Sequence, residues 1–206
     1  MISNINDKLD KMFPDAKCEL NYNKDYELLI ATVLSAQCTD KRVNEVTKVL
    51  FNKYDIFSLA ASNKKDIEDI IRSCGSYTKK SDYIINIANS LVEMFGGKVP
   101  NDRDYLESLP GVGRKTTNVV LSNLYDVPAI AVDTHVERVS KRLKLANKND
   151  SVLTVEKKLM KKIPKDKWSR IHHQLVLFGR YVCKSKNPEC DNCLLKEYCN
   201  YYKINK

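Results

Sequence analysis

The stretch of sequence that decides the fold is Leu109-Pro110-Gly111-Val112-Gly113-Arg114-Lys115-Thr116. Pro110 favours a turn, and the two glycines permit a positive φ and leave no side chain in the way. A helix is predicted to begin after Gly113, so its free backbone N–H groups and the positive end of its dipole face whatever lies over the turn. Such a turn can bind a phosphate group, although an ordinary connection between two helices can have the same residues.

Lys115 is predicted to lie in the first turn of that helix, where the helix dipole repels a cation. The repulsion favours the neutral amine, which is the form that a nucleophilic lysine uses. Two roles remain open from these residues alone: contact with a nucleic-acid phosphate, and covalent catalysis through an imine.

The rest of the chain also favours helices. Only 6 of the 206 residues are Gly and 6 are Pro, which is well below average usage. Hydrophobic residues make up 43% and charged residues 30%, an ordinary balance for a globular protein. Apolar residues recur at helical spacing, and the one strand-like run is residues 128–132 (PAIAV). We therefore predict an all-α protein, with the Asn/Lys/Asp-rich residues 144–150 as a hinge between two lobes.

Local signals set the predicted helix limits. Thr39 or Asp40 is expected to cap a helix, and glycines are expected to end two others, near Gly75 and at Gly96-Gly97. Further helices are predicted after residue 133, over residues 151–162 and over residues 167–181.

The charge of the chain indicates a polyanionic partner. Lys plus Arg number 35 against 26 Asp plus Glu, a net charge of +9, which fits nucleic acid but does not require it. The first 13 residues are charged and lack the apolar region of a secretory signal. No apolar stretch approaches the roughly 20 residues of a membrane span, so we expect an intracellular protein with no membrane partner.

Four of the seven cysteines lie close together, in the pattern C-x6-C-x2-C-x5-C from Cys183 to Cys199. In a reducing compartment such a cluster more often holds metal than forms disulfides. Zinc and a cubane iron–sulfur cluster both remain possible from the spacing. Cys18, Cys38 and Cys74 are scattered and are interpreted as small buried hydrophobic residues.

Asp133 follows an apolar run and precedes a predicted helix, so it is expected to be the N-cap, with Thr134 and Glu137 as a competing capping box. A capping carboxylate can also face a cleft and act as a base or stabilise a positive charge.

Together these motifs resemble the endonuclease III family of base-excision DNA glycosylases, in its helix–hairpin–helix, iron–sulfur branch. The resemblance covers most of the chain, and several long motifs occur in the family's order. They are Leu34-Ser35-Ala36-Gln37-Cys38-Thr39-Asp40, the turn at 109–116, Val132-Asp133-Thr134-His135-Val136-x-Arg138-Val139, His172-His173, Gly179-Arg180-Tyr181 and the four-cysteine tail.

The resemblance implies a two-lobed, all-α helix–hairpin–helix fold with a C-terminal cluster loop. Residues 20–130 would form a helical-bundle lobe that contains the helix–hairpin–helix at about 103–124. Residues 1–19 and 131–206 would form the second lobe, with the cluster loop at 183–199. The implied activity is removal of oxidised pyrimidines and cleavage 3′ to abasic sites by β-elimination. A non-catalytic, metal-bearing DNA-binding protein is the alternative hypothesis.

The resemblance also implies roles for single residues. Lys115 would be the nucleophile that forms a Schiff base, and Asp133 its essential carboxylate. Cys183, Cys190, Cys193 and Cys199 would hold a [4Fe–4S] cluster. The residues expected to contact damaged double-stranded DNA are Gln37, Tyr77, Lys79, Leu109, Gly111, Gly113, Arg114, Thr116 and His135. We expect a monomer in the cytoplasm, associated with the nucleoid.

One departure from the family pattern concerns the loop Gly75-Ser76-Tyr77-Thr78-Lys79-Lys80. The family commonly inserts a leucine of this loop into the DNA stack, and Ser76 stands in its place here. Ser76 is too small to separate stacked bases, so Tyr77 is the candidate for that role.

Overall fold

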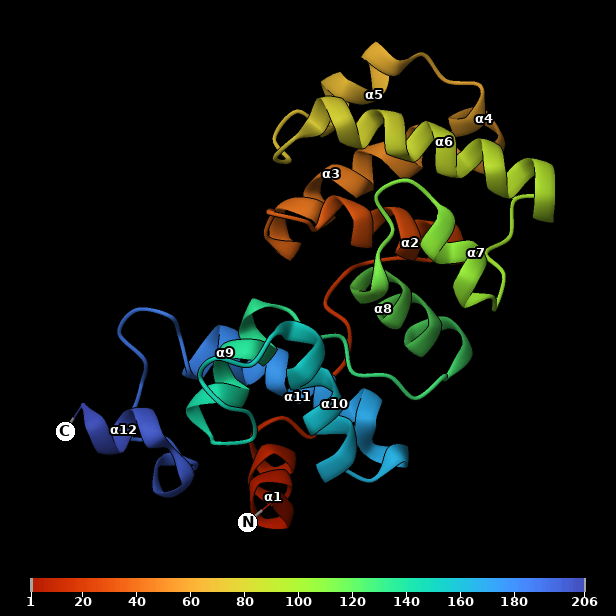
Figure 1. The fold of residues 1–206 in the computed structure, drawn as a ribbon. Helices are drawn as coiled ribbons and strands as arrows, with labels where there is room; N and C mark the ends of the chain where they lie inside the picture. The colour runs from red at the N-terminus through yellow and green to blue at the C-terminus, as the bar shows by residue number, and fades with distance from the viewer. Residues whose placement is uncertain (1, 206) are drawn as a thin grey trace. The chain divides into compact units, whose positions relative to one another are not determined.

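The computed structural model describes residues 2–205, and every regular element in that range is a helix (Figure 1). The chain divides into two compact units. We call Cys18–Tyr125 the bundle unit, and Met1–Lys17 together with Asp126–Lys206 the cysteine unit. Sequence analysis set the limits of the lobes at residues 20 and 130. No helix among the described residues combines the length and apolar character that a membrane span needs.

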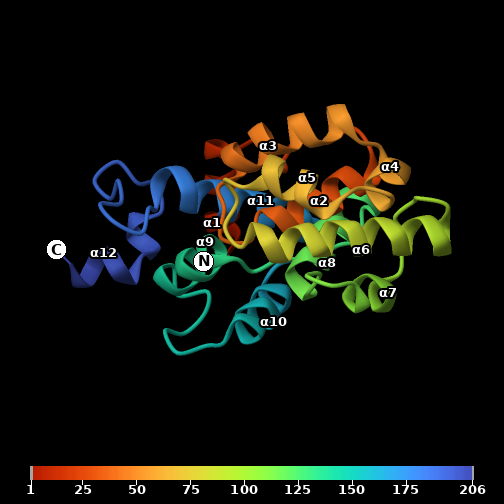
Figure 2. The same ribbon diagram turned by 90° about the horizontal axis from the view of Figure 1, so that it is seen from above.

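The bundle unit is built around one fully buried helix. Its elements are α2 (Asp25–Leu34), α3 (Asp40–Lys53), α4 (Ile56–Ala60), α5 (Lys64–Ile71), α6 (Tyr77–Phe95), α7 (Arg103–Ser108) and α8 (Arg114–Tyr125). Nine of the ten residues of α2 are buried, which explains why its sequence is apolar on every side. α3, α6 and α8 pack against α2, and α4 and α5 pack along α6 (Figure 2).

The cysteine unit joins the two ends of the chain. Its helices are α1 (Ile2–Met12), α9 (Thr134–Arg142), α10 (Val152–Lys162), α11 (Trp168–Leu177) and α12 (Asn200–Ile204). A π-helical turn, η2 (Phe178–Val182), continues α11, and the 3₁₀ turns η1 (Lys165–Lys167) and η3 (Lys196–Tyr198) are short connections. Ile5 and Leu9 of α1 share one hydrophobic core with Phe178, Leu195 and Cys199.

Several helix ends predicted from local signals are confirmed. Thr39 is the N-cap of α3, and its side chain accepts a hydrogen bond from the Arg42 N–H. Ser151 caps α10 in the same way. α6 ends at Gly96, whose φ of 59° places it in the left-handed region that favours glycine.

The strand-like residues 128–132 form no strand, in agreement with the all-α prediction, and Ile130 and Val132 are buried in the core of the cysteine unit. Two local expectations are wrong. Gly75 does not end a helix in the left-handed conformation, because α5 already ends at Ile71 and Gly75 has no positive φ. Residues 144–150 are not a hinge between the two units, because they lie inside the cysteine unit between α9 and α10. Lys162 Nζ holds this connection by donating to the Leu145 carbonyl at 2.7 Å, and Lys158 pairs with Asp150 at 2.6 Å.

Candidate active site and metal centre

The predicted hairpin is present within the bundle unit. α7 ends at Ser108, a tight turn follows in which the Val112 N–H donates to the Leu109 carbonyl at 3.1 Å, and α8 begins at Arg114. Arg103 Nη2 donates to Asn118 Oδ1 at 2.8 Å and so ties the two helices of the hairpin together.

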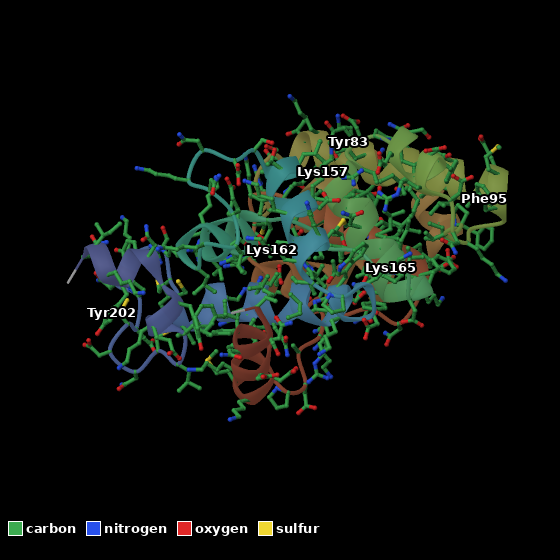
Figure 3. All side chains as sticks on the ribbon, turned by 60° about the horizontal axis from the view of Figure 1, so that its bottom comes forward. Tyr83, Phe95, Lys157, Lys162, Lys165 and Tyr202 are labelled. Carbon is green, nitrogen blue, oxygen red and sulfur yellow. The ribbon has the colours of Figure 1, made fainter. Side chains whose placement is uncertain are left out.

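The two glycines of the turn have different roles. Gly111 has a φ of +76°, and a Cβ at this position would lie 2.4 Å from Cδ2 of Tyr83. Tyr83, labelled in Figure 3, belongs to α6 and packs directly under the turn. Gly113 does not need a positive φ, and a Cβ added there would meet no described atom within 4 Å. The expectation that both glycines serve a positive φ is therefore correct only for Gly111.

We expect Gly111→Ala to lower the free energy of unfolding by about 1–3 kcal/mol, because the alanine is strained at this φ and clashes with the Tyr83 ring. Gly113→Ala is the matched control, with an expected change within about 0.5 kcal/mol. Denaturant unfolding of both variants measures the difference. Equal losses of stability would contradict this account of the turn.

Lys115 is exposed in the first turn of α8. Its amine makes no hydrogen bond or ion pair with the residues that the structure describes. Arg114, Gly111 and Gly113 are also exposed, so the turn and the start of α8 present their backbone and two cations to solvent.

Two other predicted DNA-contacting residues of this segment are buried instead. Leu109 is 5% exposed and Thr116 is 9% exposed, so their side chains pack into the bundle unit.

Asp133 is the N-cap of α9 within the cysteine unit. Its Oδ1 accepts hydrogen bonds from the backbone N–H groups of His135 and Val136, at 2.9 and 2.8 Å. The capping box of Thr134 and Glu137 is therefore not the cap that forms. Oδ2 of Asp133 accepts no hydrogen bond from the described residues. The cap thus leaves one carboxylate oxygen available to a ligand.

His135 is fixed by the π-helical turn that follows α11. A Cβ on Gly179 would lie 2.8 Å from the His135 Cβ, so only glycine allows η2 to approach α9 this closely. Arg138 secures the same contact, because its Nη2 donates to the Gly179 carbonyl at 2.6 Å and its Nε to the Cys183 carbonyl at 3.1 Å.

Gln37 lies in an exposed loop after α2 and adopts a left-handed φ of 56°. Lys80, which is 4% exposed, holds this loop: its Nζ donates to the Leu34 and Ala36 carbonyls, at 2.9 and 2.6 Å. Burial lowers the pKa of Lys80. The sequence alone does not indicate this role of Lys80, because the contact joins residues 46 positions apart.

Tyr77 and Lys79 lie at the start of α6, next to Ser76. Ser76 also has a left-handed φ, of 58°, and its small side chain is exposed. Tyr77 is half-buried and Lys79 exposed, so both reach the surface of the bundle unit. The loop that contains Gln37 and the loop that contains Ser76 therefore each have one non-glycine residue in the left-handed conformation. Such a conformation costs about 1–3 kcal/mol, and such residues cluster at functional sites.

The four clustered cysteines line one cavity of the cysteine unit. The wall of this cavity includes Cys183, Cys190, Cys193 and Cys199. Mostly apolar side chains complete the wall, together with Glu189 and Lys196; Tyr202 of α12, which is labelled in Figure 3, is among them. Among residues 2–205, no three His, Cys, Asp or Glu side chains are placed to hold one metal ion.

The surroundings of these sulfurs suit thiolate ligands. Arg142 Nη1 donates to Cys183 Sγ at 3.3 Å, and the Tyr202 N–H donates to Cys199 Sγ at 3.4 Å. Burial, and then the neighbouring cysteines, raise the pKa of Cys190. Burial also raises the pKa of Cys193. The raised pKa values mean that forming several neighbouring thiolates here is unfavourable, and a cationic group in the cavity would offset this effect. The four cysteines therefore fit a metal cofactor bound through thiolates.

Sequence analysis missed Arg142 and Tyr83. Arg142 also donates to the Lys184 carbonyl at 2.8 Å and stacks 4.0 Å over the Tyr201 ring. Its position in the last turn of α9 marks it only as a cation at a helix C-terminus, and Tyr83 appears only as part of an apolar stripe.

A family model described as HhH-GPD superfamily base excision DNA repair protein matches residues 30–165. This range includes the hairpin and Asp133. The fold and the site thus define a base-excision DNA repair protein of the helix–hairpin–helix class.

Individual relatives show which family of this class the chain belongs to. The endonuclease III of Bacillus subtilis (strain 168) is 52% identical over 194 residues, which cover 94% of this chain and 89% of that protein. The endonuclease III of Escherichia coli (strain K12) is 41% identical over 192 residues, 91% of this chain and 89% of that protein. The chain therefore belongs to the endonuclease III family, and it is a DNA glycosylase and AP lyase.

Solved structures agree with this assignment. A non-covalent endonuclease III–DNA complex superposes with a TM-score of 0.96 at 53% identity, over 99% of this chain and 96% of that one. A trapped endonuclease III–DNA covalent intermediate gives a TM-score of 0.95 at 53% identity, with the same coverage. A thermostable thymine-DNA glycosylase, at 22% identity and a TM-score of 0.82, shares the fold. The alternative of a non-catalytic DNA-binding protein is not favoured.

Proposed function

We propose that this enzyme removes oxidised pyrimidines from double-stranded DNA and cleaves the strand 3′ to the resulting abasic site, with Lys115 as nucleophile. The observation that carries the proposal is the position of Lys115: its amine is exposed and without a protein partner among the described residues, directly after the Gly111–Gly113 turn. A lysine bound in an ion pair would not be available to attack a sugar.

The hairpin is proposed to hold the DNA backbone. The first backbone N–H groups of α8 have no carbonyl partner within the helix, and the helix dipole adds a positive potential there. A DNA phosphate supplies both acceptor oxygens and negative charge. The open space beside Gly113 allows a phosphate to approach the backbone.

The reaction needs a nucleotide outside the base stack. Flipping it costs a few kcal/mol, and less when the base is damaged. Gln37 and Tyr77, both in surface loops of the bundle unit, are the candidates to fill the gap left in the duplex. A tyrosine ring can stack on the remaining bases, which the small Ser76 side chain cannot do.

Lys115 is proposed to attack C1′ of the flipped nucleotide as a neutral amine. A C–N bond forms to Lys115 Nζ, the bond to the base breaks, and the base leaves with that electron pair and takes up a proton. Opening of the sugar ring gives an iminium ion on Lys115. Loss of a proton from C2′ then expels the 3′-phosphate, and water hydrolyses the imine to restore the amine.

Asp133 is proposed to stabilise the positive charge that develops at C1′ and on the iminium. Its Oδ1 is already committed to two backbone N–H groups, which fixes the orientation of the carboxylate. Oδ2 is then the oxygen that we propose interacts with the developing positive charge. A pre-oriented anion stabilises developing positive charge without reorganisation during the step.

The cavity of four cysteines is proposed to hold a [4Fe–4S] cluster through Cys183, Cys190, Cys193 and Cys199. Zinc sites usually show two C-x2-C pairs or histidine ligands, whereas this segment has one C-x2-C pair between two more widely spaced cysteines and no histidine. When bound, the cluster would cross-link four points of the loop, so the folding of the loop would depend on it. We further propose a monomer that acts on damaged duplex DNA at the nucleoid.

The function is tested with a duplex that contains one oxidised pyrimidine and another that contains one abasic site. The native protein is expected to incise both and to form a covalent protein–DNA adduct when borohydride reduces the imine. Absence of an adduct on the abasic duplex would contradict the lysine mechanism. Incision of the abasic duplex alone would contradict the proposed removal of oxidised pyrimidines.

Protein purified without oxygen is expected to contain about four iron atoms per chain and to absorb in the visible range. Cys193→Ser should lose iron and lower the melting temperature, since one cluster ligand is missing. Cys18→Ser is the matched control, because Cys18 lies outside the cavity, and it should keep its iron. Stoichiometric zinc instead of iron would contradict the cluster assignment.

A further inference from the structure

Two of the remaining cysteines, which the proposed mechanism does not use, lie in contact. Cys38 Sγ and Cys74 Sγ are 3.7 Å apart, although they are separated by 36 positions in the sequence. Cys38 follows α2 and Cys74 follows α5, both in the bundle unit. Cys74 is 1% exposed, whereas Cys38 is half-buried. Sequence analysis interpreted both as isolated hydrophobic residues.

The pair joins the two loops that carry Gln37 and Tyr77. Gly75 packs so closely on Gln37 that a Cβ at Gly75 would lie 3.3 Å from the Gln37 carbonyl oxygen. Gln37 and Ser76 are also two non-glycine residues with a left-handed φ. The sulfurs thus lie one residue from Gln37 and three residues from Tyr77, where a covalent link would act directly on both loops.

The two sulfurs are not equivalent. Burial raises the pKa of Cys74 to about 11, and the neighbouring Cys38 adds to the shift, while Lys80 and Arg42 oppose it. Cys74 is therefore a protonated thiol at neutral pH. Cys38 is the more exposed residue of the pair, so we expect a dissolved oxidant to react with Cys38 first.

We propose that Cys38 and Cys74 are a reversible thiol-oxidation site, oxidised by low-molecular-weight disulfides, whose disulfide bond lowers the affinity of the enzyme for damaged DNA. The oxidation site rests on the contact between the two sulfurs. The effect on DNA affinity rests on the proposed function, in which Gln37 and Tyr77 contact the DNA. A disulfide bond is about 2.05 Å long, so the sulfurs must approach by about 1.7 Å. Rotation of the two side chains or a shift of the loops can bring the sulfurs together, and the bond would then fix the distance between the Gln37 loop and the Ser76 loop.

The oxidation proceeds by two exchanges. The Cys38 thiolate attacks one sulfur of the small disulfide, forms a mixed disulfide and releases one small thiolate. Cys74 then gives up its proton and attacks Cys38 Sγ, which expels the second small thiolate. The two cysteines lose two electrons and two protons in total, and the small disulfide becomes two thiols. A reducing dithiol reverses both steps.

The site is tested on the metal-loaded protein by equilibration with oxidised and reduced glutathione, alkylation of free thiols and peptide mapping. We expect a Cys38–Cys74 cross-link at ratios that leave Cys18 alkylated and the metal content unchanged. The Cys38→Ser variant should give no cross-link. A glutathione adduct that persists on Cys38, or cross-links scattered over other cysteines, would overturn the site.

Its effect is tested by fluorescence anisotropy with a duplex that carries a stable abasic-site analogue. Oxidation should raise the Kd of the wild-type protein about five-fold or more, and dithiothreitol should restore it. Cys38→Ser and Cys74→Ala should bind equally before and after glutathione treatment, and Cys18→Ser should respond like the wild type. A cross-linked protein with unchanged Kd would refute the effect on DNA binding. Failure of the proposed function can be told apart from failure of this inference. If the proposed function were wrong, the reduced wild-type protein would not bind the analogue, but the peptide map would still show the Cys38–Cys74 cross-link.

Discussion

Lys115→Ala is expected to abolish the borohydride-trapped adduct and to lower strand cleavage at an abasic site by about 10³-fold or more, since Lys115 is the proposed source of the amine that forms the imine. The melting temperature should change little, because the Lys115 side chain is exposed and makes no hydrogen bond or ion pair with the described residues. Single-turnover cleavage of an abasic duplex and gel analysis of the adduct measure the two effects.

Lys79→Ala is the matched control for Lys115→Ala, because it also removes one positive charge near the start of a helix. Lys79 is exposed in the first turn of α6, and it is a proposed DNA contact but not a nucleophile. This variant should bind more weakly, with a smaller dependence on salt, and still form the adduct. An adduct that persists in Lys115→Ala would show that another amine is the nucleophile.

Asp133→Asn is expected to reduce both base removal and strand cleavage by about 10²-fold or more while leaving the stability nearly unchanged. Asparagine caps a helix as well as aspartate does, so the two backbone hydrogen bonds to the side chain can be kept. The negative charge is lost, and with it the proposed stabilisation of the cation. Asp133→Ala should lose the activity and, in addition, about 1 kcal/mol of stability.

The same substitution at another N-cap separates capping from catalysis. Asp55 caps α4 and accepts a hydrogen bond from the Ser58 N–H at 2.8 Å. Asp55→Asn should leave the activity at the wild-type level, because Asp55 has no proposed role at the DNA. If Asp133→Asn retained full activity, Asp133 would be a structural cap only.

Sequence reasoning succeeded where short-range signals decide the structure. Capping residues and glycines at helix ends act within one turn, which is why the ends at Thr39, Ser151 and Gly96 were predictable. Residues 128–132 are the one strand-like run, and they form no strand. Their β-branched, apolar composition suits a strand, but a strand needs a partner, and burial in the helical core satisfies the same residues without one.

In the candidate site, too, short motifs were predictable from the sequence, whereas contacts between helices were not. The sequence named Lys115, Asp133 and the four clustered cysteines, because each lies in a motif of adjacent residues. It did not reveal that Tyr83 lies beneath Gly111, or that Lys80 holds the Gln37 loop. These supports join different helices, and no periodic pattern within either helix indicates its partner.

By itself, the sequence determined the helical class and the position of the hairpin, since both depend on neighbouring residues, and through a family resemblance it indicated the residues that we propose for the chemistry. Only the tertiary structure decided what these residues contact. It showed that Asp133 caps through one carboxylate oxygen and leaves the other available, and that Arg142 donates to Cys183 Sγ. It also brought Cys38 to 3.7 Å from Cys74. Such contacts depend on how whole helices pack, because packing brings together residues that the local sequence cannot relate.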